Sequence, residues 1–298
     1  MHKNLTLGDL QDYELLDSGD QLKLERFGSY VLGRPETQAI WRPGLERKDW
    51  ERANAVFKAT NDKFGHSRPR SDVPDKWMLH SKMPEKWLMH HKKLAFYAKL
   101  APFKHTGVFP EQAVQWDWMS ELIKKSKREV NVLNLFAYTG IATLACAEAG
   151  AKVTHVDSSY PAIGWAKANQ IASKLQDKPI RWIEDDVVRF VSREINRGAK
   201  YDGIIMDPPV RGHGANGEVW SFNDSFPKLV SDCSKLLSDN PLFFLVNAYA
   251  VSFYPSTLEN ILMDHLPDEN FECGEICIKE KSLGRMLSTG IYARWTGK

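Results

Sequence analysis

Hydrophobic and polar positions follow different patterns in the two parts of the chain, and the change falls near residue 115. Beyond it, short apolar runs alternate with longer amphipathic stretches. The runs predict strands at 131–136, 152–156, 180–183, 202–206 and 242–247, and the stretches predict helices at 141–149, 160–175, 187–196, 226–238 and 257–266. Strands that alternate with helices form βαβ units, so we expect a parallel sheet with helices on both faces.

The end of the chain has a different pattern. Two further apolar runs, at 272–279 and 286–295, are separated by only six residues. Such a short connection cannot hold a crossover helix, so these runs should pair as an antiparallel hairpin. Residues 111–298 are therefore expected to form an α/β domain with a seven-stranded sheet in which one strand is reversed.

The first 110 residues lack this alternation. Short apolar runs broken by Gly, Pro and charged residues predict strands at 13–20, 23–28 and 30–35. Residues 50–58 are expected to form a short helix, and residues 66–71 an exposed loop. Residues 1–110 are thus predicted to be a small β-rich module that could bind the substrate or RNA.

Composition narrows the class of protein. The 298 residues are 43% hydrophobic and 26% charged, which excludes a disordered, collagen-like or disulfide-scaffold chain. The net charge of +2 indicates no partner by itself. No apolar run approaches the ~20 residues that cross a membrane, so no membrane partner is expected. The four cysteines lack zinc-site spacing; we expect reduced thiols, no metal and a cytoplasmic protein.

Open α/β sheets bind ligands at the carboxyl ends of their strands, so candidate site residues are expected there. The first strand contains Asn134 and runs into Phe136, Ala137, Tyr138, Thr139 and Gly140. Gly140 permits close approach of the backbone to a ligand, and the following helix N-terminus suits a carboxylate. An ordinary strand-to-helix turn would have the same residues. The G-x-G-x-x-G pyrophosphate fingerprint is absent.

Acidic residues follow the second and third strands. Asp157 can accept both hydroxyls of a ribose, or it can cap the helix that starts near Ser158. Asp185 or Asp186, just before Val187, can accept an adenine amino hydrogen while a neighbouring backbone N–H meets a ring nitrogen. Alternatively, these acids only complement the helix dipole.

The fourth strand ends in Asp207, Pro208 and Pro209. The two prolines fix φ and remove two N–H donors, which leaves a rigid acceptor edge for the amino or ring group of a planar substrate. A proline stop after a buried strand is the simpler alternative. The Gly-rich stretch 211–220 is predicted to be a mobile loop over the site.

Taken in order, these strand ends resemble those of class I S-adenosylmethionine (SAM)-dependent methyltransferases. The similarity is greatest to the family that includes the 23S rRNA cytosine-5 methyltransferases, and residues 105–112 match a segment that packs near the SAM methionine there. The resemblance implies a Rossmann-like domain with SAM as cofactor. The residues expected to bind it are Thr106, Phe109, Gln112, Asn134, residues 136–140, Asp157, Ser158, Asn169, Asp185, Asp186, Val187 and Asp207.

The resemblance is incomplete at the catalytic residues. Cytosine-5 methylation requires a Cys thiolate that attacks C6, yet neither the fourth nor the fifth strand ends in Cys. The four cysteines are at 146, 233, 273 and 277. A covalent route is therefore not expected. The expected catalytic residues are Asp207, Pro208, Pro209 and Asn247, which act on an atom with its own lone pair.

A basic segment, residues 76–104, contains seven lysines and one acid, with aromatic residues interleaved. Lysines bind phosphates and aromatic rings stack on bases, although an amphipathic hairpin with a buried aromatic face has the same pattern. We predict a SAM-dependent methyltransferase acting on RNA, with ribosomal RNA favoured. The alternatives are a protein or small-molecule methyltransferase, a non-catalytic SAM- or RNA-binding protein, and a nucleotide-dependent dehydrogenase.

Overall fold

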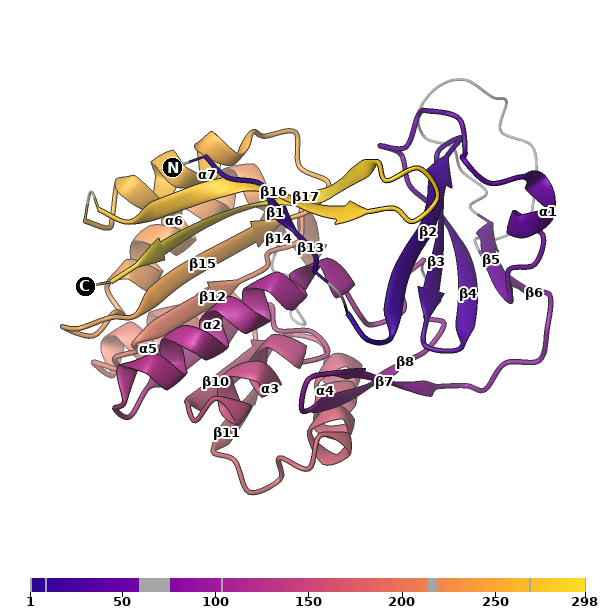
Figure 1. The fold of residues 1–298 in the computed structure, drawn as a ribbon. Coiled ribbons are helices and arrows are strands. Elements are labelled where there is room, and N and C mark those ends of the chain that lie inside the picture. Colours follow the sequence, from indigo (N-terminus) through magenta and orange to yellow (C-terminus); the bar gives the residue numbers. More distant parts are fainter. Residues whose placement is uncertain are drawn as a thin grey trace. The chain divides into compact units, whose positions relative to one another are not determined.

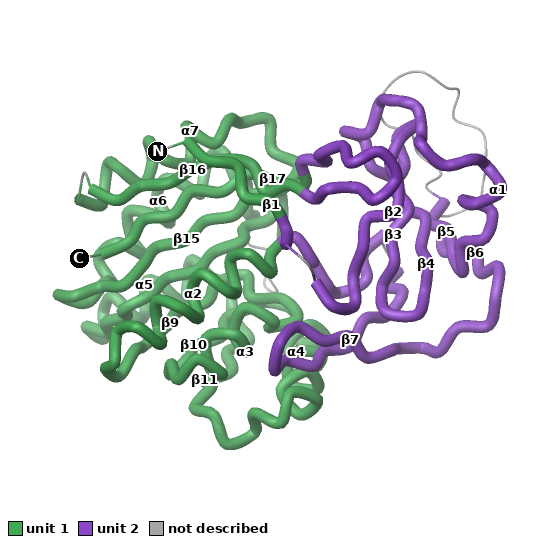
Figure 2. Tube along the Cα trace, viewed as in Figure 1, with its two compact units in different colours: residues 1–6, 112–277, 289–298 green, residues 7–111, 278–288 purple. Residues whose placement is uncertain are grey.

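The chain forms two compact units in the computed structural model, which describes residues 2–8, 10–58, 76–102, 104–213, 219–267 and 269–297. The first unit comprises residues 1–6, 112–277 and 289–298, and the second comprises residues 7–111 and 278–288 (Figure 2). The sequence pattern predicts two contiguous domains, residues 1–110 and residues 111–298. In the structure, residues 1–6 belong to the first unit and residues 278–288 to the second. The predicted loop at 66–71 and residues 214–218 of the Gly-rich stretch lie outside the described residues.

The first unit is built on one large sheet. Its order is β1 (Leu5–Thr6), β16 (Phe271–Lys279), β17 (Met286–Thr296), β15 (Phe243–Ala248), β12 (Gly203–Met206), β9 (Asn131–Leu135), β10 (Lys152–Asp157) and β11 (Ile180–Glu184). The five strands from β15 to β11 are parallel, and β17 is antiparallel to β15. The expected α/β class and terminal hairpin are confirmed.

The sheet has eight strands rather than the predicted seven. The additional strand is β1, which pairs in parallel with β16 through Leu5 and Ile276. Leu5 and Ile276 are both buried and share a small core cluster with Tyr292. Two residues are too few to show a hydrophobic alternation, so no pattern in the sequence indicated this strand.

Helices cover both faces of this sheet (Figure 1). On one face, α2 (Ala113–Ser126) brings Trp118 against Phe243 with ring centroids 5.5 Å apart. The next residue, Phe244, points to the opposite face, where it joins the core formed with α5 (Val187–Asn196), α6 (Phe222–Ser234) and α7 (Pro255–Met263). Because successive side chains point to opposite faces, the central strands are apolar throughout.

The second unit contains a five-stranded sheet and a separate hairpin. The sheet runs β2 (Tyr13–Gly19), β3 (Leu22–Phe27), β4 (Tyr30–Pro35), β5 (Ala55–Lys58) and β6 (Lys76–Leu79). The prediction of a helix at 50–58 is wrong. Helix α1 (Arg47–Trp50) ends at the residue where the predicted helix begins, and residues 55–58 form β5. Ala55 and Phe57 are buried in alternation, and β5 pairs with β6.

Residues 278–288, the end of the terminal hairpin, are bound within this second unit. Ser282 Oγ donates to Asp17 Oδ1 over 2.6 Å, and the Lys281 amide donates to the Leu15 carbonyl over 2.8 Å. Ser18 Oγ donates to Glu280 Oε2 over 2.5 Å. Asp17 and Glu280 are buried, so the segment is a built-in part of the unit.

The basic segment begins with β6, and its residues 87–98 form the hairpin of β7 (Trp87–His91) and β8 (Leu94–Ala98). Trp87 is 7% exposed, and its ring meets that of Tyr30 edge to face at 5.0 Å. Lys92 and Lys93 form the exposed turn. The hairpin therefore has a buried aromatic face and a solvated basic one, so Trp87 cannot stack on a base; its lysines remain able to contact phosphates.

Two kinds of feature were not found in the described part of the chain. None of its helices combines the length and the apolar character that a bilayer span needs. Nor do three or more His, Cys, Asp or Glu side chains gather there in the manner of a metal site.

Candidate functional site

The turn between β9 and α3 (Ile141–Glu148) has an unusual backbone. Phe136, Tyr138 and Gly140 all have positive φ, at 53°, 47° and 78°. The Ala137 amide donates to the Val156 carbonyl of β10 over 3.1 Å, which fixes the turn to the next strand. No side chain caps the N-terminus of α3, so its first N–H groups suit an anionic ligand.

Gly140 is required at this turn by packing. A Cβ atom there would lie 2.8 Å from the Cβ of Ala166 in α4 (Tyr160–Ala172). Gly140 was expected because a ligand approaches the backbone there. The structure gives a further reason for glycine, the close packing of the turn against α4.

Buried polar side chains hold the turn from the protein interior. Asn134 Nδ2 donates to Thr143 Oγ1 over 2.9 Å, and Thr143 Oγ1 lies 3.0 Å from His155 Nδ1. Asn169 Nδ2 donates to the Thr139 carbonyl over 2.9 Å. Asn134 and Asn169 are 3% and 0% exposed, so their contribution to a ligand is through the turn that they hold.

His155 makes the stability of the first unit sensitive to acid. Burial lowers the pKa of His155 to about 3 from an ordinary value of 6.5. Below pH 6.5 the unfolded chain binds a proton that the folded chain excludes, so stability falls as the pH falls. We expect His155 to contribute a loss of about 1.4 kcal/mol per pH unit between pH 6 and 4.

Urea unfolding at pH 7, 6, 5 and 4 measures this dependence. His155→Gln should show a shallower loss than the unmodified protein, whereas the exposed His265→Gln should not. Parallel pH curves for the unmodified protein and His155→Gln would contradict the prediction.

Asp157, at the end of β10, is bound to the turn by a hydrogen bond. Its Oδ2 accepts from the Tyr138 amide and its Oδ1 from the Ser159 amide, both over 2.8 Å. The cap of α4 is Ser159 rather than Asp157. Burial raises the pKa of Asp157, and these two amides oppose the rise. A carboxylate has about four acceptor positions, so room remains for two ribose hydroxyls; Ser158 beside it is exposed.

Asp157→Ala should weaken SAM binding by roughly 1–3 kcal/mol, because the substitution removes hydrogen bonds to a charged acceptor. Isothermal calorimetry with SAM and S-adenosylhomocysteine measures the change. The exposed Asp177→Ala serves as the matched control and should bind SAM normally. Equal SAM affinity in both variants would remove Asp157 from the site.

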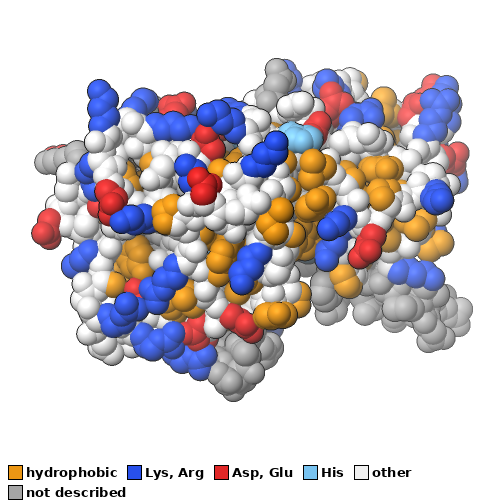
Figure 3. All heavy atoms as spheres, turned by 90° about the horizontal axis from the view of Figure 1, so that it is seen from below, with side chains coloured by type: hydrophobic (Ala, Val, Ile, Leu, Met, Phe, Trp, Pro, Cys, Tyr) orange, Lys and Arg blue, Asp and Glu red, His pale blue; other side chains and the backbone are white. Residues whose placement is uncertain are grey.

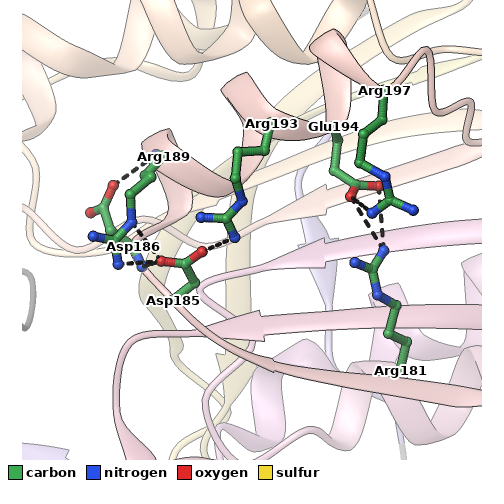
Figure 4. A network of polar contacts seen from close by, with 7 residues as sticks. All are labelled: Arg181, Asp185, Asp186, Arg189, Arg193, Glu194 and Arg197. Carbon is green, nitrogen blue, oxygen red and sulfur yellow. Dashed lines mark hydrogen bonds and ion pairs between the residues drawn. The ribbon is translucent and has the colours of Figure 1, made fainter.

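The acids after β11 have partners inside the protein (Figure 4). Asp185 accepts from the side chains of Arg189 and Arg193. Asp186 caps α5, and its Oδ1 accepts from the Arg189 amide over 2.9 Å. Val187 is a core residue. Asp186 therefore has the role of the alternative interpretation, an acid at the start of a helix. The Asp185 amide donates to the Asp157 carbonyl over 3.1 Å and links this strand end to β10.

The end of β12 is enclosed by an aromatic pair. Trp220 Nε1 donates to the Pro209 carbonyl over 2.6 Å, and the Trp220 ring lies 5.1 Å from that of Phe136. The carbonyl of Pro209 thus has an indole donor within the protein. Part of the predicted loop is also ordered, because β13 (Arg211–His213) pairs with β14 (Val219–Ser221). Pro208 is buried and Asp207 is partly exposed.

The end of β15 contributes an acceptor at the same level as Asp207. Met206 pairs with Val246 in parallel register, so Asp207 and Asn247 follow at matching positions on neighbouring strands. Asn247 is 2% exposed, and within the described residues its Oδ1 has no donor. An unsatisfied buried acceptor costs roughly 1–3 kcal/mol, so this oxygen fits an N–H group supplied by a ligand.

Gln112 and Tyr249 form a contact beside these residues that sequence patterns did not indicate. Gln112 Nε2 at the start of α2 donates to the Tyr249 hydroxyl just after β15. The Tyr249 ring lies over Gly290, where a Cβ would come within 2.9 Å of it. A glycine in the middle of the predicted strand was the available signal, since it often marks close approach.

Thr106 and Phe109 belong to the second unit. Thr106 is buried, with its hydroxyl 3.3 Å from the Val108 carbonyl, and Phe109 packs on His105 with ring centroids 5.5 Å apart. Arg34 donates to the Lys104 carbonyl over 3.1 Å and so fixes the start of this segment. The two residues remain predicted cofactor contacts.

The first unit is thus an α/β domain with polar groups at the carboxyl ends of the five neighbouring strands β15, β12, β9, β10 and β11, the place where such domains bind ligands. Residues 101–265 match the methyltransferase small domain family, and the chain belongs to this family.

Solved structures agree with this assignment. The chain is similar to a SAM-dependent methyltransferase from Agrobacterium tumefaciens, with 38% identity, a TM-score of 0.92, and coverage of 99% of this chain and 94% of that one. A putative methyltransferase complexed with S-adenosylhomocysteine shares the fold, with a TM-score of 0.74 at 17% identity, over 97% and 76% of the two chains. The protein is a SAM-dependent methyltransferase.

Sequence relatives include the ribosomal RNA large subunit methyltransferase K/L of Shewanella frigidimarina. The identity is 33% over 147 residues, which are 49% of this chain and 20% of that protein. A Pseudoalteromonas atlantica protein of the same name is 29% identical over 184 residues. The match spans only a fifth to a quarter of the length of these relatives.

Proposed function

We propose that this methyltransferase acts on RNA in the cytoplasm, with ribosomal RNA as the favoured acceptor, and that transfer is direct rather than through a covalent enzyme–RNA adduct. The names of the sequence relatives support the RNA acceptor. On the face drawn in Figure 3, Lys and Arg side chains are interspersed with hydrophobic and acidic ones. The finer resemblance to cytosine-5 enzymes supports an RNA base as the methylated group.

The residues divide between cofactor and acceptor. SAM supplies a methyl group already activated on a sulfonium. The turn 136–140 and the α3 N-terminus would hold its carboxylate, Asp157 its ribose, and the strand end at 185–187 its adenine through backbone groups. Asp207 and Asn247 would hold the N–H groups of a planar base, with Gln112 and Tyr249 beside them. Orientation and exclusion of water then supply most of the catalysis.

The unpaired Asn247 oxygen beside Asp207 carries this proposal. Two acceptors at adjacent strand ends match the hydrogens of an amino group, and an acceptor atom with a lone pair needs no enzyme nucleophile. The cysteines support the same conclusion. They lie in α3, α6 and β16, all buried, and burial raises the pKa of Cys146 to about 12.

Replacement of all four cysteines by Ala or Ser should leave methyl transfer per folded molecule close to that of the unmodified protein. Loss of buried thiols should lower stability by roughly 1 kcal/mol each. Turnover and melting temperature are measured together. A folded single variant without turnover, combined with a trapped covalent RNA adduct in the unmodified protein, would show that transfer is covalent.

Parallel transfer of a tritiated methyl group tests the acceptor class. Purified protein is given total RNA, total protein and a metabolite extract from cells that lack it. We expect label in large-subunit ribosomal RNA. Label confined to protein or to small molecules would reject the RNA proposal and favour the corresponding alternative.

A further inference from the structure

Helix α5, together with its C-cap residue Arg197, carries a row of arginines on its exposed side. Arg189, Arg193 and Arg197 follow at four-residue intervals, so they lie along one stripe. Their side chains are 46%, 53% and 61% exposed, and Arg181 of β11 is 44% exposed beside them. The remaining charged side chain of α5, Glu194, is 2% exposed. All charge that this helix presents to solvent is therefore positive.

Two buried carboxylates hold these four guanidinium groups (Figure 4). Asp185 accepts from Arg189 and Arg193. Glu194 accepts from Arg197 over 2.7 Å and lies 3.3 Å from Arg181; its other oxygen accepts from the Tyr201 hydroxyl over 2.7 Å. Residues 181–197 contain four arginines and four acids, and two of the acids, Asp185 and Glu194, are buried. A guanidinium has five N–H donors, so Arg181, Arg193 and Arg197 can each donate to a further acceptor.

This arrangement differs from ordinary surface ion pairs. The carboxylates lie beneath the arginines and fix their positions, which reduces the conformational entropy that phosphate binding would otherwise cost. The row extends about 12 Å along the helix, enough for about two or three consecutive phosphates of one strand. A linear polyanion fits such a row better than a single small anion.

The row starts at the reacting edge of the sheet. Helix α5 begins directly after β11, whose end is joined to β10 by the hydrogen bond from the Asp185 amide to the Asp157 carbonyl. From there the arginines lead away from the proposed cofactor site along the side of the first unit. We propose that this row, Arg181, Arg189, Arg193 and Arg197, binds the sugar–phosphate backbone of RNA that flanks the methylated nucleotide. The inference rests on the proposed RNA acceptor.

The test is binding to large-subunit ribosomal RNA transcribed in vitro. Affinity is measured at KCl concentrations from about 50 to 400 mM, because salt weakens binding that depends on phosphate contacts. The slope of log affinity against log salt is negative, and each lost phosphate contact makes it shallower by about 0.7–0.9. Arg193→Gln/Arg197→Gln should therefore make the slope shallower by about 1.4–1.8 and leave SAM affinity unchanged. Asp185 keeps Arg189, and Glu194 keeps Arg181, so neither carboxylate loses all its arginine partners.

Lys228→Gln/Lys235→Gln is the matched control, because these exposed basic side chains are likewise ion-paired with an acid on their own helix, Asp232. It should leave the slope unchanged. If the double arginine variant melts below the assay temperature, each single variant should make the slope shallower by about 0.7–0.9. Arg193→Lys/Arg197→Lys, which keeps the charge, should restore most of the slope.

The outcomes separate the two proposals. A folded arginine variant with the slope of the unmodified protein would overturn the row as an RNA surface and leave it a purely structural ion-pair network, even if RNA methylation continues. Absence of both methylation and binding of RNA by the unmodified protein would overturn the proposed function itself.

Discussion

Asp207→Asn should lower the rate of methyl transfer about 10²–10⁴-fold, the range for removal of a positioned acid–base or hydrogen-bonding group. Asp207 follows β12 directly, and the buried Pro208 fixes the backbone that carries it. The amide keeps the size of the side chain but replaces one acceptor by a donor, which opposes an N–H group of the base.

Single-turnover transfer with saturating SAM measures this effect separately from cofactor binding. The affinity for SAM should change by less than the rate, since Asp207 is assigned mainly to the acceptor. The exposed Asp239→Asn is the control. A transfer rate within a few-fold of the unmodified protein would show that Asp207 has no part in the chemistry.

Gly140→Ala should destabilise the first unit by about 2–4 kcal/mol and weaken SAM binding in parallel. Two effects add here: an L-residue at a φ of 78°, and a Cβ atom 2.8 Å from that of Ala166. Relief of the overlap requires movement of the turn that leads into α3, so the two losses have one cause.

Urea unfolding and calorimetry test this pair of losses. Gly150→Ala has a φ of 109° but nothing within 4 Å of the added Cβ, so it isolates the backbone strain. Ala166→Gly in the Gly140→Ala background should restore part of the SAM affinity. A variant at Gly140 as stable as the unmodified protein would contradict the packing role.

The parallel sheet could be predicted because each of its elements carries its own pattern. Helix α5 begins and ends where its amphipathic stretch does, and β12 and β15 are apolar on both faces. Partners across the chain leave no such pattern. Trp220 follows residues with no periodicity, and its bond to the Pro209 carbonyl depends on how β13 pairs with β14.

The candidate site was predictable to the same extent. Strand ends bring Asp157, Asp207 and Asn247 to one edge by topology alone. The side chain that each carboxylate contacts was not predictable: Asp185 and Asp186 follow the same strand, yet one binds arginines and the other caps α5. Burial of Trp87 likewise depends on Tyr30, 57 residues earlier in the sequence.

The assignment of residues 278–288 to the second unit has a consequence for biosynthesis. Residues 7–111 are made first, but the segment that supplies Glu280, Lys281 and Ser282 follows 278 − 111 = 167 residues later. At about 5–20 residues per second, this is an interval of roughly 8–33 s. Until then the carboxylate of Asp17 and the carbonyl of Leu15 lack these partners. The second unit therefore matures only after translation of the methyltransferase sheet is almost finished, and a nascent chain stalled before residue 278 holds an incomplete form of both units.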